Sequence, residues 1–111
     1  MHTIILATKR KPDVSLSEFI RHYHDVHAPL AQRLPGLLEY RQMLIRHEGP
    51  RSDEAIDYDA VSIYVFKDDE SAEAAWKSPE GVLLEEDTGK FIDWPSVLAM
   101  PVGPAKIHRP A

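Results

Sequence analysis

Residues 58–66, YDAVSIYVF, give the strongest indication of the fold, because they are apolar on both faces of the strand that they predict. Side chains alternate along a strand, so these residues divide between two faces. One face carries Ala60, Tyr64 and Phe66, and the other carries Val61, Ile63 and Val65. A sheet that is covered on one side only alternates apolar with polar residues. Both faces of the sheet that contains this strand are therefore expected to be covered.

The residues before this strand predict a strand, a helix and a second strand. Residues 2–9 are rich in β-branched side chains, which favours a strand. Ser15 with Glu18 three places later forms a capping box, and apolar residues spaced three or four apart continue from Leu16 to Leu34. Pro29 lacks the amide that a helix needs, so we expect the helix to bend or restart near His27. Residues 37–47 then predict a strand, and residues 48–57 a polar loop.

The residues after it predict a short helix at 70–77, one or two helical turns at 82–92, and a strand at 94–100. Pro95 and Pro101 limit that last strand to an edge of the sheet, since proline cannot donate to a neighbouring strand. Further prolines predict that residues 95–111 end the chain as an extended arm. We expect residues 1–111 to form one domain.

The order strand, helix, strand, strand, helix, strand predicts an α+β ferredoxin-like fold, βαββαβ, with one antiparallel sheet. Two helices cover only one face of such a sheet. The simplest cover for the helix-free face is the same face of a second copy, which predicts a homodimer. The alternative is that the C-terminal arm or the long loop folds over this face.

Composition excludes several classes of function. The net charge is −5 and no basic cluster offsets it, which argues against a nucleic-acid partner. The chain has no cysteine, so thiolate metal sites, disulfides and cysteine nucleophiles are absent. No segment has the roughly 20 apolar residues that span a bilayer, and the first residues lack a signal-peptide pattern. We expect a cytoplasmic protein with no membrane partner.

Several motifs in the first 45 residues resemble the EthD family, which is named from ethyl tert-butyl ether degradation. They are KRKP at 9–12, SEF at 17–19, HYH at 22–24, HAPLA at 27–31, LPGL at 34–37 and Tyr40. The resemblance implies a dimeric α/β barrel whose sheets meet face to face. Related barrels isomerise muconolactones or cyclise polyketides without metal or organic cofactor, using His and Tyr side chains between helix and sheet. For many EthD-like proteins no reaction is established.

His27 and Tyr40 are the candidate catalytic residues. His27 follows Tyr23 by four residues and precedes Leu30 by three, so its ring lies on the apolar stripe that faces the sheet. Burial lowers the pKa of such a ring and a helix C-terminus raises it, which leaves it suited to acid–base work. The alternative is a core His held by backbone carbonyls. Tyr40 is a candidate hydrogen-bond donor to a substrate oxygen, or a residue that only packs its ring.

Other aromatic and histidine side chains are candidates for the lining of a pocket. The predicted substrate-binding residues are Phe19, Tyr23, His24, Tyr64 and Trp76. A metal site is not expected. On an α-helix His22 and His24 point about 200° apart, so only His24 and His27 share a face, and two ligands make a poor site. No glycine-rich phosphate loop, dinucleotide fingerprint or nucleophile elbow is present.

Three functions remain open from the sequence. The first is a cofactor-free isomerase, cyclase or lyase that acts on a small apolar carbonyl or aromatic compound, for example in the catabolism of xenobiotic or aromatic compounds. The second is a non-catalytic ligand-binding or accessory protein of a degradation pathway. The third is a cofactor-independent or haem-using monooxygenase.

Overall fold

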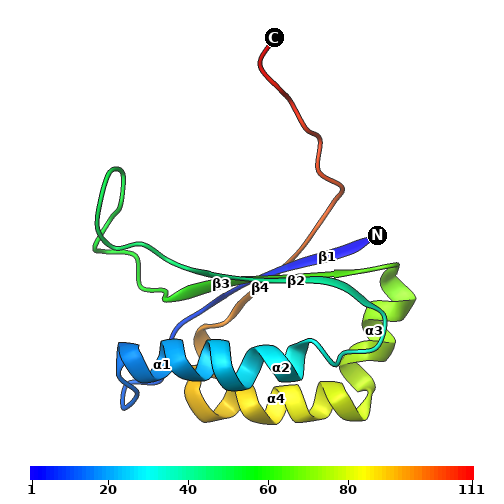
Figure 1. The fold of residues 1–111 in the computed structure, drawn as a ribbon, viewed down its shortest axis with the longest axis horizontal. Coiled ribbons are helices and arrows are strands. Elements are labelled where there is room, and N and C mark those ends of the chain that lie inside the picture. Colours follow the sequence, from blue (N-terminus) through cyan, green and yellow to red (C-terminus); the bar gives the residue numbers. More distant parts are fainter.

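The computed structural model describes residues 1–111, and helices cover one face of a four-stranded antiparallel sheet (Figure 1). The strands are β1 (His2–Thr8), β2 (Leu37–Leu44), β3 (Ala60–Phe66) and β4 (Leu98–Val102). Their order in the sheet is β2-β3-β1-β4. This is the predicted α+β ferredoxin-like topology, and β4 lies at an edge as its prolines required.

The first helical region is built from three pieces in sequence, α1 (Leu16–His22), a π-helical turn (Tyr23–His27) and α2 (Ala28–Ala31). Ser15 caps α1, since its side-chain oxygen accepts a hydrogen bond from the Glu18 amide at 3.2 Å. The irregularity predicted near His27 is present, but as a wider turn rather than a break. The Ala28 amide donates to the Tyr23 carbonyl, five residues back.

The second helical region is longer than the sequence predicted. It consists of α3 (Asp69–Lys77) and α4 (Pro79–Phe91), where only one or two turns were expected after residue 82. Pro79 and Gly81 suggested a break, yet both suit a helix start. Pro79 occupies the first turn, where its missing amide costs nothing, and Ser78 caps the helix through the Gly81 amide. Because the length of α4 was underestimated, the site residues on this helix were not predicted.

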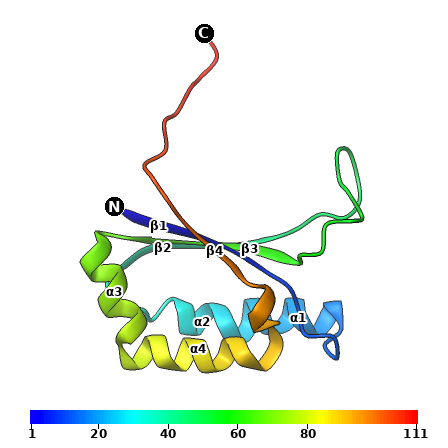
Figure 2. The ribbon, with the colours of Figure 1, turned by 180° about the vertical axis from the view of Figure 1, so that it is seen from behind.

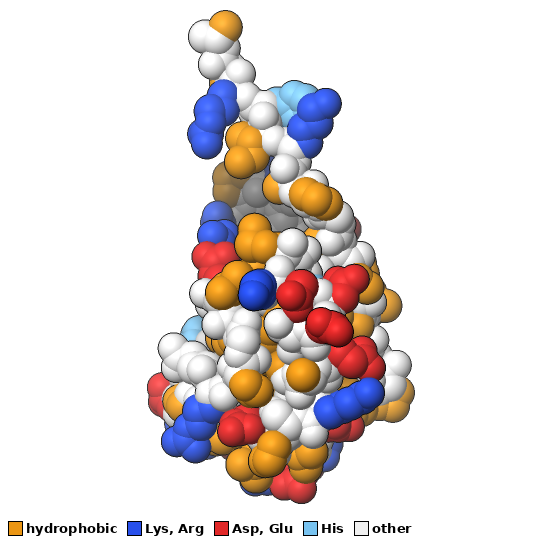
Figure 3. All heavy atoms as spheres, turned by 90° about the vertical axis from the view of Figure 1, so that its right-hand side faces the viewer, with side chains coloured by type: hydrophobic (Ala, Val, Ile, Leu, Met, Phe, Trp, Pro, Cys, Tyr) orange, Lys and Arg blue, Asp and Glu red, His pale blue; other side chains and the backbone are white.

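A short 3₁₀ turn (Trp94–Ser96) joins α4 to β4, so β4 begins at Leu98 rather than at the predicted Trp94. Residues 103–111 have no regular structure and are exposed. They rise, with the β2–β3 loop, on the side of the sheet that has no helices (Figures 1 and 2). The space-filling view shows this arm standing clear of the body (Figure 3).

The strand register shows which side chains form each face of the sheet. Ser62 and Tyr64 of β3 face the helices and pair with Leu6 and Ile4 of β1. The helix-free face lies on the alternate positions, and its central strands are apolar as predicted. That face consists of Thr3, Ile5 and Ala7, Val61, Ile63 and Val65, Glu39, Arg41 and Met43, and Leu98, Met100 and Val102. None of the helices is long and apolar enough to cross a membrane.

Candidate active site

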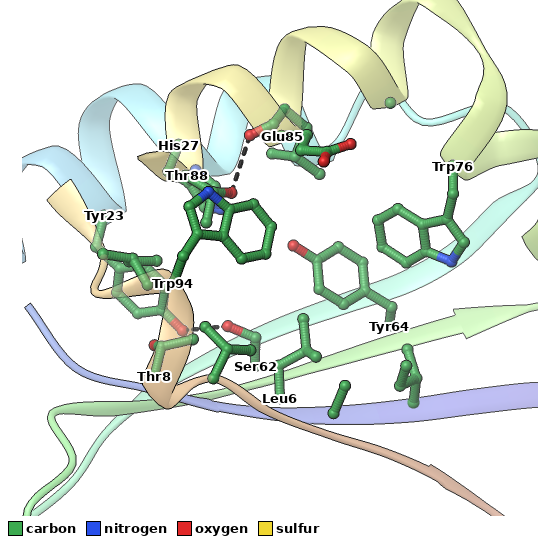
Figure 4. Close-up of a pocket in the computed structure, with 16 residues that line it drawn as sticks. Leu6, Thr8, Tyr23, His27, Ser62, Tyr64, Trp76, Glu85, Thr88 and Trp94 are labelled. Atoms are coloured by element: carbon green, nitrogen blue, oxygen red, sulfur yellow. Dashed lines mark hydrogen bonds between the residues drawn. The ribbon is translucent and has the colours of Figure 1, made fainter. Parts of the chain in front are cut away.

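A cavity of about 310 Å³ lies between the helices and the sheet (Figure 4). Its aliphatic walls come from both layers and consist of Ile4, Leu6, Leu84, Ile92, Val97 and Ala99. Aromatic rings of Tyr23, Tyr64, Trp76 and Trp94 add to this surface. A mostly apolar cavity of this size with a few polar groups is typical of a small-molecule site.

His27 forms part of the cavity wall, and its ring is held by a carboxylate that the sequence did not reveal. The Nδ1 atom of His27 lies 2.8 Å from Oδ2 of Asp87 on α4, and both side chains are buried. Because a carboxylate accepts a hydrogen bond, it favours the tautomer in which Nδ1 carries the proton. The Nε2 atom makes no hydrogen bond within the protein. The neutral ring therefore has a basic nitrogen that no protein group occupies.

The environment of His27 keeps this ring neutral. Burial lowers the pKa of His27 below its ordinary value of 6.5, and the hydrogen bond and charge of Asp87 oppose that effect without cancelling it. The ring is therefore a free base at neutral pH. It also gains a stabilising counter-charge whenever it takes up a proton.

Asp87 binds a second histidine at the same time. The Nε2 atom of His22 lies 2.9 Å from Oδ1 and 3.0 Å from Oδ2 of Asp87, and the His22 ring stacks on Phe91 with centroids 4.1 Å apart. Two residues of one helix separated by five positions reach one carboxylate because the π-helical turn lies between them. No set of three or more acidic or histidine side chains is arranged to hold a metal ion.

Three hydroxyl groups add donors to the cavity wall. The Tyr23 hydroxyl pairs with the Ser62 hydroxyl and donates to the Val61 carbonyl at 3.3 Å. The Tyr64 hydroxyl points into the open part of the cavity, between Trp94 and Trp76 (Figure 4). Burial raises the pKa of Tyr23 and raises that of Tyr64 well above the ordinary value. Both phenols therefore stay protonated and act as hydrogen-bond donors.

Three of the predicted site residues do not line the cavity. The Tyr40 ring packs on Tyr64 with centroids 4.6 Å apart, and its hydroxyl accepts a hydrogen bond from Nε2 of Gln42 at 2.9 Å. His24 is exposed and bonds the side-chain oxygen of Gln42 at 2.9 Å. Phe19 is fully buried in the core. The predicted residues His27, Tyr23, Tyr64 and Trp76 all line the cavity.

Several residues of the site were not predicted from the sequence. They are Asp87, Glu85 and Thr88 on α4, together with His22 from the first helical region and Ser62 from β3. One signal was available for Asp87. It stands three residues after Leu84 and four before Phe91, so it interrupts the buried stripe of α4 with a carboxylate. An acidic side chain on an apolar helix face is rarely buried unless it is paired.

A known domain family matches most of this chain in sequence. The EthD domain matches residues 11–95. The chain belongs to the EthD family. The family expected from the sequence is therefore confirmed, and the match extends well beyond the first 45 residues that suggested it. No functionally curated protein matches this EthD protein in sequence.

Solved structures show the same fold. An ethyl tert-butyl ether degradation family protein from Bacillus halodurans has 23% identity and a TM-score of 0.76, with 95% of this chain and 100% of that chain covered. SnoaB from Streptomyces nogalater, described as a cofactor-independent oxygenase, has 14% identity and a TM-score of 0.66, with 96% and 94% covered. A dimeric ferredoxin-like protein of unknown function from Thermobifida fusca has 12% identity and a TM-score of 0.71, with 93% and 90% covered.

Proposed function

We propose that this EthD protein is a cofactor-free enzyme of the isomerase, cyclase or lyase type that acts on a small apolar carbonyl or aromatic compound. The observation that carries the proposal is the buried pair of His27 and Asp87 in the wall of an apolar cavity, with Nε2 of His27 free of protein partners. A buried His–carboxylate pair beside a cavity is typical of general acid–base catalysis.

The chemistry that fits this pair is proton transfer. Nε2 of His27 takes a proton from a carbon next to a carbonyl, or from an enol or phenol oxygen, and the electron pair moves onto the substrate oxygen. Asp87 stabilises the imidazolium that forms. The same nitrogen then returns the proton to another atom of the substrate, which completes an isomerisation, or to a leaving group, which completes an elimination.

We assign the role of the polarising donor to Tyr64 rather than to Tyr40. The Tyr64 phenol is protonated and points into the cavity, where it can donate to an oxygen that gains negative charge (Figure 4). Tyr40 packs behind that ring, with its hydroxyl bonded to Gln42. In this proposal Tyr40 supports the orientation of Tyr64 and does not meet the substrate.

An oxygenase is the second candidate, because SnoaB has the same fold and is described as a cofactor-independent oxygenase. The first step is shared, since removal of a proton by His27 leaves an electron-rich substrate anion. In an oxygenase that anion reduces O₂, whereas in an isomerase or lyase it is reprotonated or expels a leaving group. Dependence of turnover on O₂ separates the two functions.

We also propose that the protein is a homodimer joined through the helix-free sheet face. The centre of that face is apolar, and Leu98, Met100 and Met43 at its margins are each more than a third exposed in one chain. Exposed apolar patches of this kind mark interaction sites. Two structural relatives are described as dimeric ferredoxin-like proteins, and a two-fold axis lets the same patch cover itself.

The test of function combines a substrate screen with two site variants. Lactones, phenols and polyketide-like acids are incubated with the protein in D₂O, with and without O₂, and products and deuterium uptake are followed by mass spectrometry and NMR. His27→Gln and Asp87→Asn should lower turnover by roughly 10²- to 10⁴-fold, the usual contribution of a general base. His108→Gln, on the exposed arm, is the matched control and should leave turnover unchanged.

Other outcomes of these experiments would refute the proposal or favour one of the alternative functions. Full activity in His27→Gln would refute the acid–base role. Tight ligand binding without turnover of any accepted compound would favour the accessory function. Turnover that needs O₂ would favour the oxygenase, and a Soret band on titration with haemin would favour its haem-using form.

A further inference from the structure

The carboxylate of Asp87 is hydrogen-bonded to two histidines, although the bond to His27 is enough to orient that ring. Its two oxygens lie 2.8 Å from Nδ1 of His27 and 2.9 to 3.0 Å from Nε2 of His22. The side chains of Asp87 and His27 are 2% and 5% exposed, whereas that of His22 is 18% exposed. The network therefore runs from the cavity wall to a ring that solvent reaches.

The second contact depends on a local distortion of the helix. In a regular α-helix, residues five apart point about 140° away from each other, so His22 and His27 would not reach the same carboxylate. The π-helical turn Tyr23–His27 closes that angle, and such turns are frequent at functional sites. The stack of His22 on Phe91 holds the ring against Asp87. The π-helical turn and the stack on Phe91 therefore both hold His22 in contact with Asp87.

We propose that His22 is a positioning residue that sets the basicity of His27 through the carboxylate the two rings share. The inference rests on the acid–base function proposed above. Nε2 of His22 donates a hydrogen bond to the same carboxylate that accepts from Nδ1 of His27. This second donor draws on the negative charge of Asp87, which leaves less of that charge to stabilise a proton on His27. His27 then remains a free base in more acidic solution than it would beside Asp87 alone.

The charged groups around the two histidines are consistent with a lowered pKa of His27. His22 bonds Asp87 from α4, and His27 from its own helical segment bonds the same carboxylate. Glu86 and Lys90 on α4, and Glu18 and Arg21 on α1, are exposed to solvent, which screens them. The charge of His22 lowers the pKa of His27, in addition to the larger effect of burial and against the pull of Asp87.

Two variants of His22 separate its charge from its hydrogen bond. His22→Phe keeps an aromatic ring to stack on Phe91 but removes the donor, whereas His22→Gln keeps an amide donor and removes the charge. The titration of His27 is followed by NMR of its ring nitrogens, which needs no substrate. The wild-type protein gives the reference midpoint of His27. Both variants should shift this midpoint upward, and the shift should be larger in His22→Phe.

The outcomes distinguish this inference from the proposed function. A midpoint of His27 that stays the same or falls in a folded His22→Phe protein would overturn the inference, whether or not an activity is found. An upward shift of the midpoint in a protein with no turnover would support the coupling and count against the enzyme. If both proposals hold, the acid limb of the pH profile of kcat/KM moves upward with the midpoint. A lower activity with an unmoved acid limb would indicate a purely structural role.

Discussion

The two faces of the sheet are built from the same strands but differ in chemistry. The face under the helices mixes apolar side chains with the hydroxyls of Thr8, Ser62 and Tyr64, and the cavity opens there. The helix-free face carries no polar side chain on its central strands except Thr3, and its charged residues Glu39 and Arg41 lie on the edge strand β2. Apart from Thr3, the polar side chains of the two central strands therefore lie on the face that the chain covers by itself.

The difference indicates what each face is suited to do. Buried polar groups need partners, and the helix layer supplies one to Ser62 through the Tyr23 hydroxyl. A face that meets its own copy gains most from plain apolar contact, which is non-directional and tolerates a symmetric interface. The face under the helices is therefore suited to chemistry, and the helix-free face is suited to the assembly that we propose.

The strongest way to break this comparison is to place a charge at the centre of the helix-free face. Ile63→Asp buries a carboxylate from each copy at the proposed two-fold interface, where desolvation costs several kcal/mol per charge. We expect the dissociation constant of the dimer to rise by at least about 10³-fold. Light scattering coupled to size exclusion measures the mass, and circular dichroism checks the fold. Val82→Asp, at an exposed site on α4, should remain dimeric.

A substitution in the helix layer tests whether the helices that cover the sheet are closely packed. A Cβ at Gly81 would meet the backbone carbonyls of Ala75 and Trp76, where α3 turns into α4. Gly81→Ala should lower the free energy of unfolding by about 2 to 3 kcal/mol through overpacking. Gly89→Ala on the same helix meets only the Trp94 side chain and should be neutral or stabilising by up to about 1 kcal/mol. Equal effects of the two in urea unfolding would contradict this packing.

The titration of His27 sharpens the comparison, because only the helix-side face holds a buried ionisable ring. The pKa of His27 is lower in the folded protein than its ordinary 6.5, so below pH 6.5 the unfolded chain binds more protons. The free energy of unfolding should therefore fall as the pH drops from 6.5 to the folded midpoint, by about 1.4 kcal/mol for each unit between the two values. Urea unfolding across this range should show a flatter pH dependence for His27→Gln. A steeper one would contradict the lowered pKa.

The smallest expected effect lies at the start of the helix layer. Ser15→Ala removes the oxygen that accepts from the Glu18 amide, which should cost about 1 kcal/mol of stability. Ser17→Ala, two residues on and exposed, should change the free energy of unfolding by less than about 0.5 kcal/mol. Thermal unfolding of both variants measures the difference. Dimer mass should be unaffected, since α1 lies on the opposite side from the proposed interface.

The sheet was predictable because its signals are local. Alternation along β3 identified both faces, and the prolines near β4 identified an edge strand. The period of the first helix placed His27 on the inward side, and the ring does line the cavity. Each of these inferences needs only the geometry of one element and the residues within it.

The helix angles were less predictable where the helix is not regular. The assumption of 100° per residue paired His24 with His27, but that pairing is wrong. His24 bonds Gln42 at the surface, and His22 is the residue that shares Asp87 with His27. A single π-helical turn changes which side chains share a face of the helix. No residue type in the segment predicts such a turn.

Local patterns were enough to predict the order of the elements, the two apolar faces of the sheet and the inward position of His27, because strand and helix periodicity act over a few residues. The partner of His27 depends instead on tertiary packing. Asp87 lies 60 residues away on α4, and the contact exists because α4 packs beside the π-helical turn with its one buried carboxylate turned inward. Such a pairing depends on how two helices lie on the sheet, which periodicity within either helix does not specify.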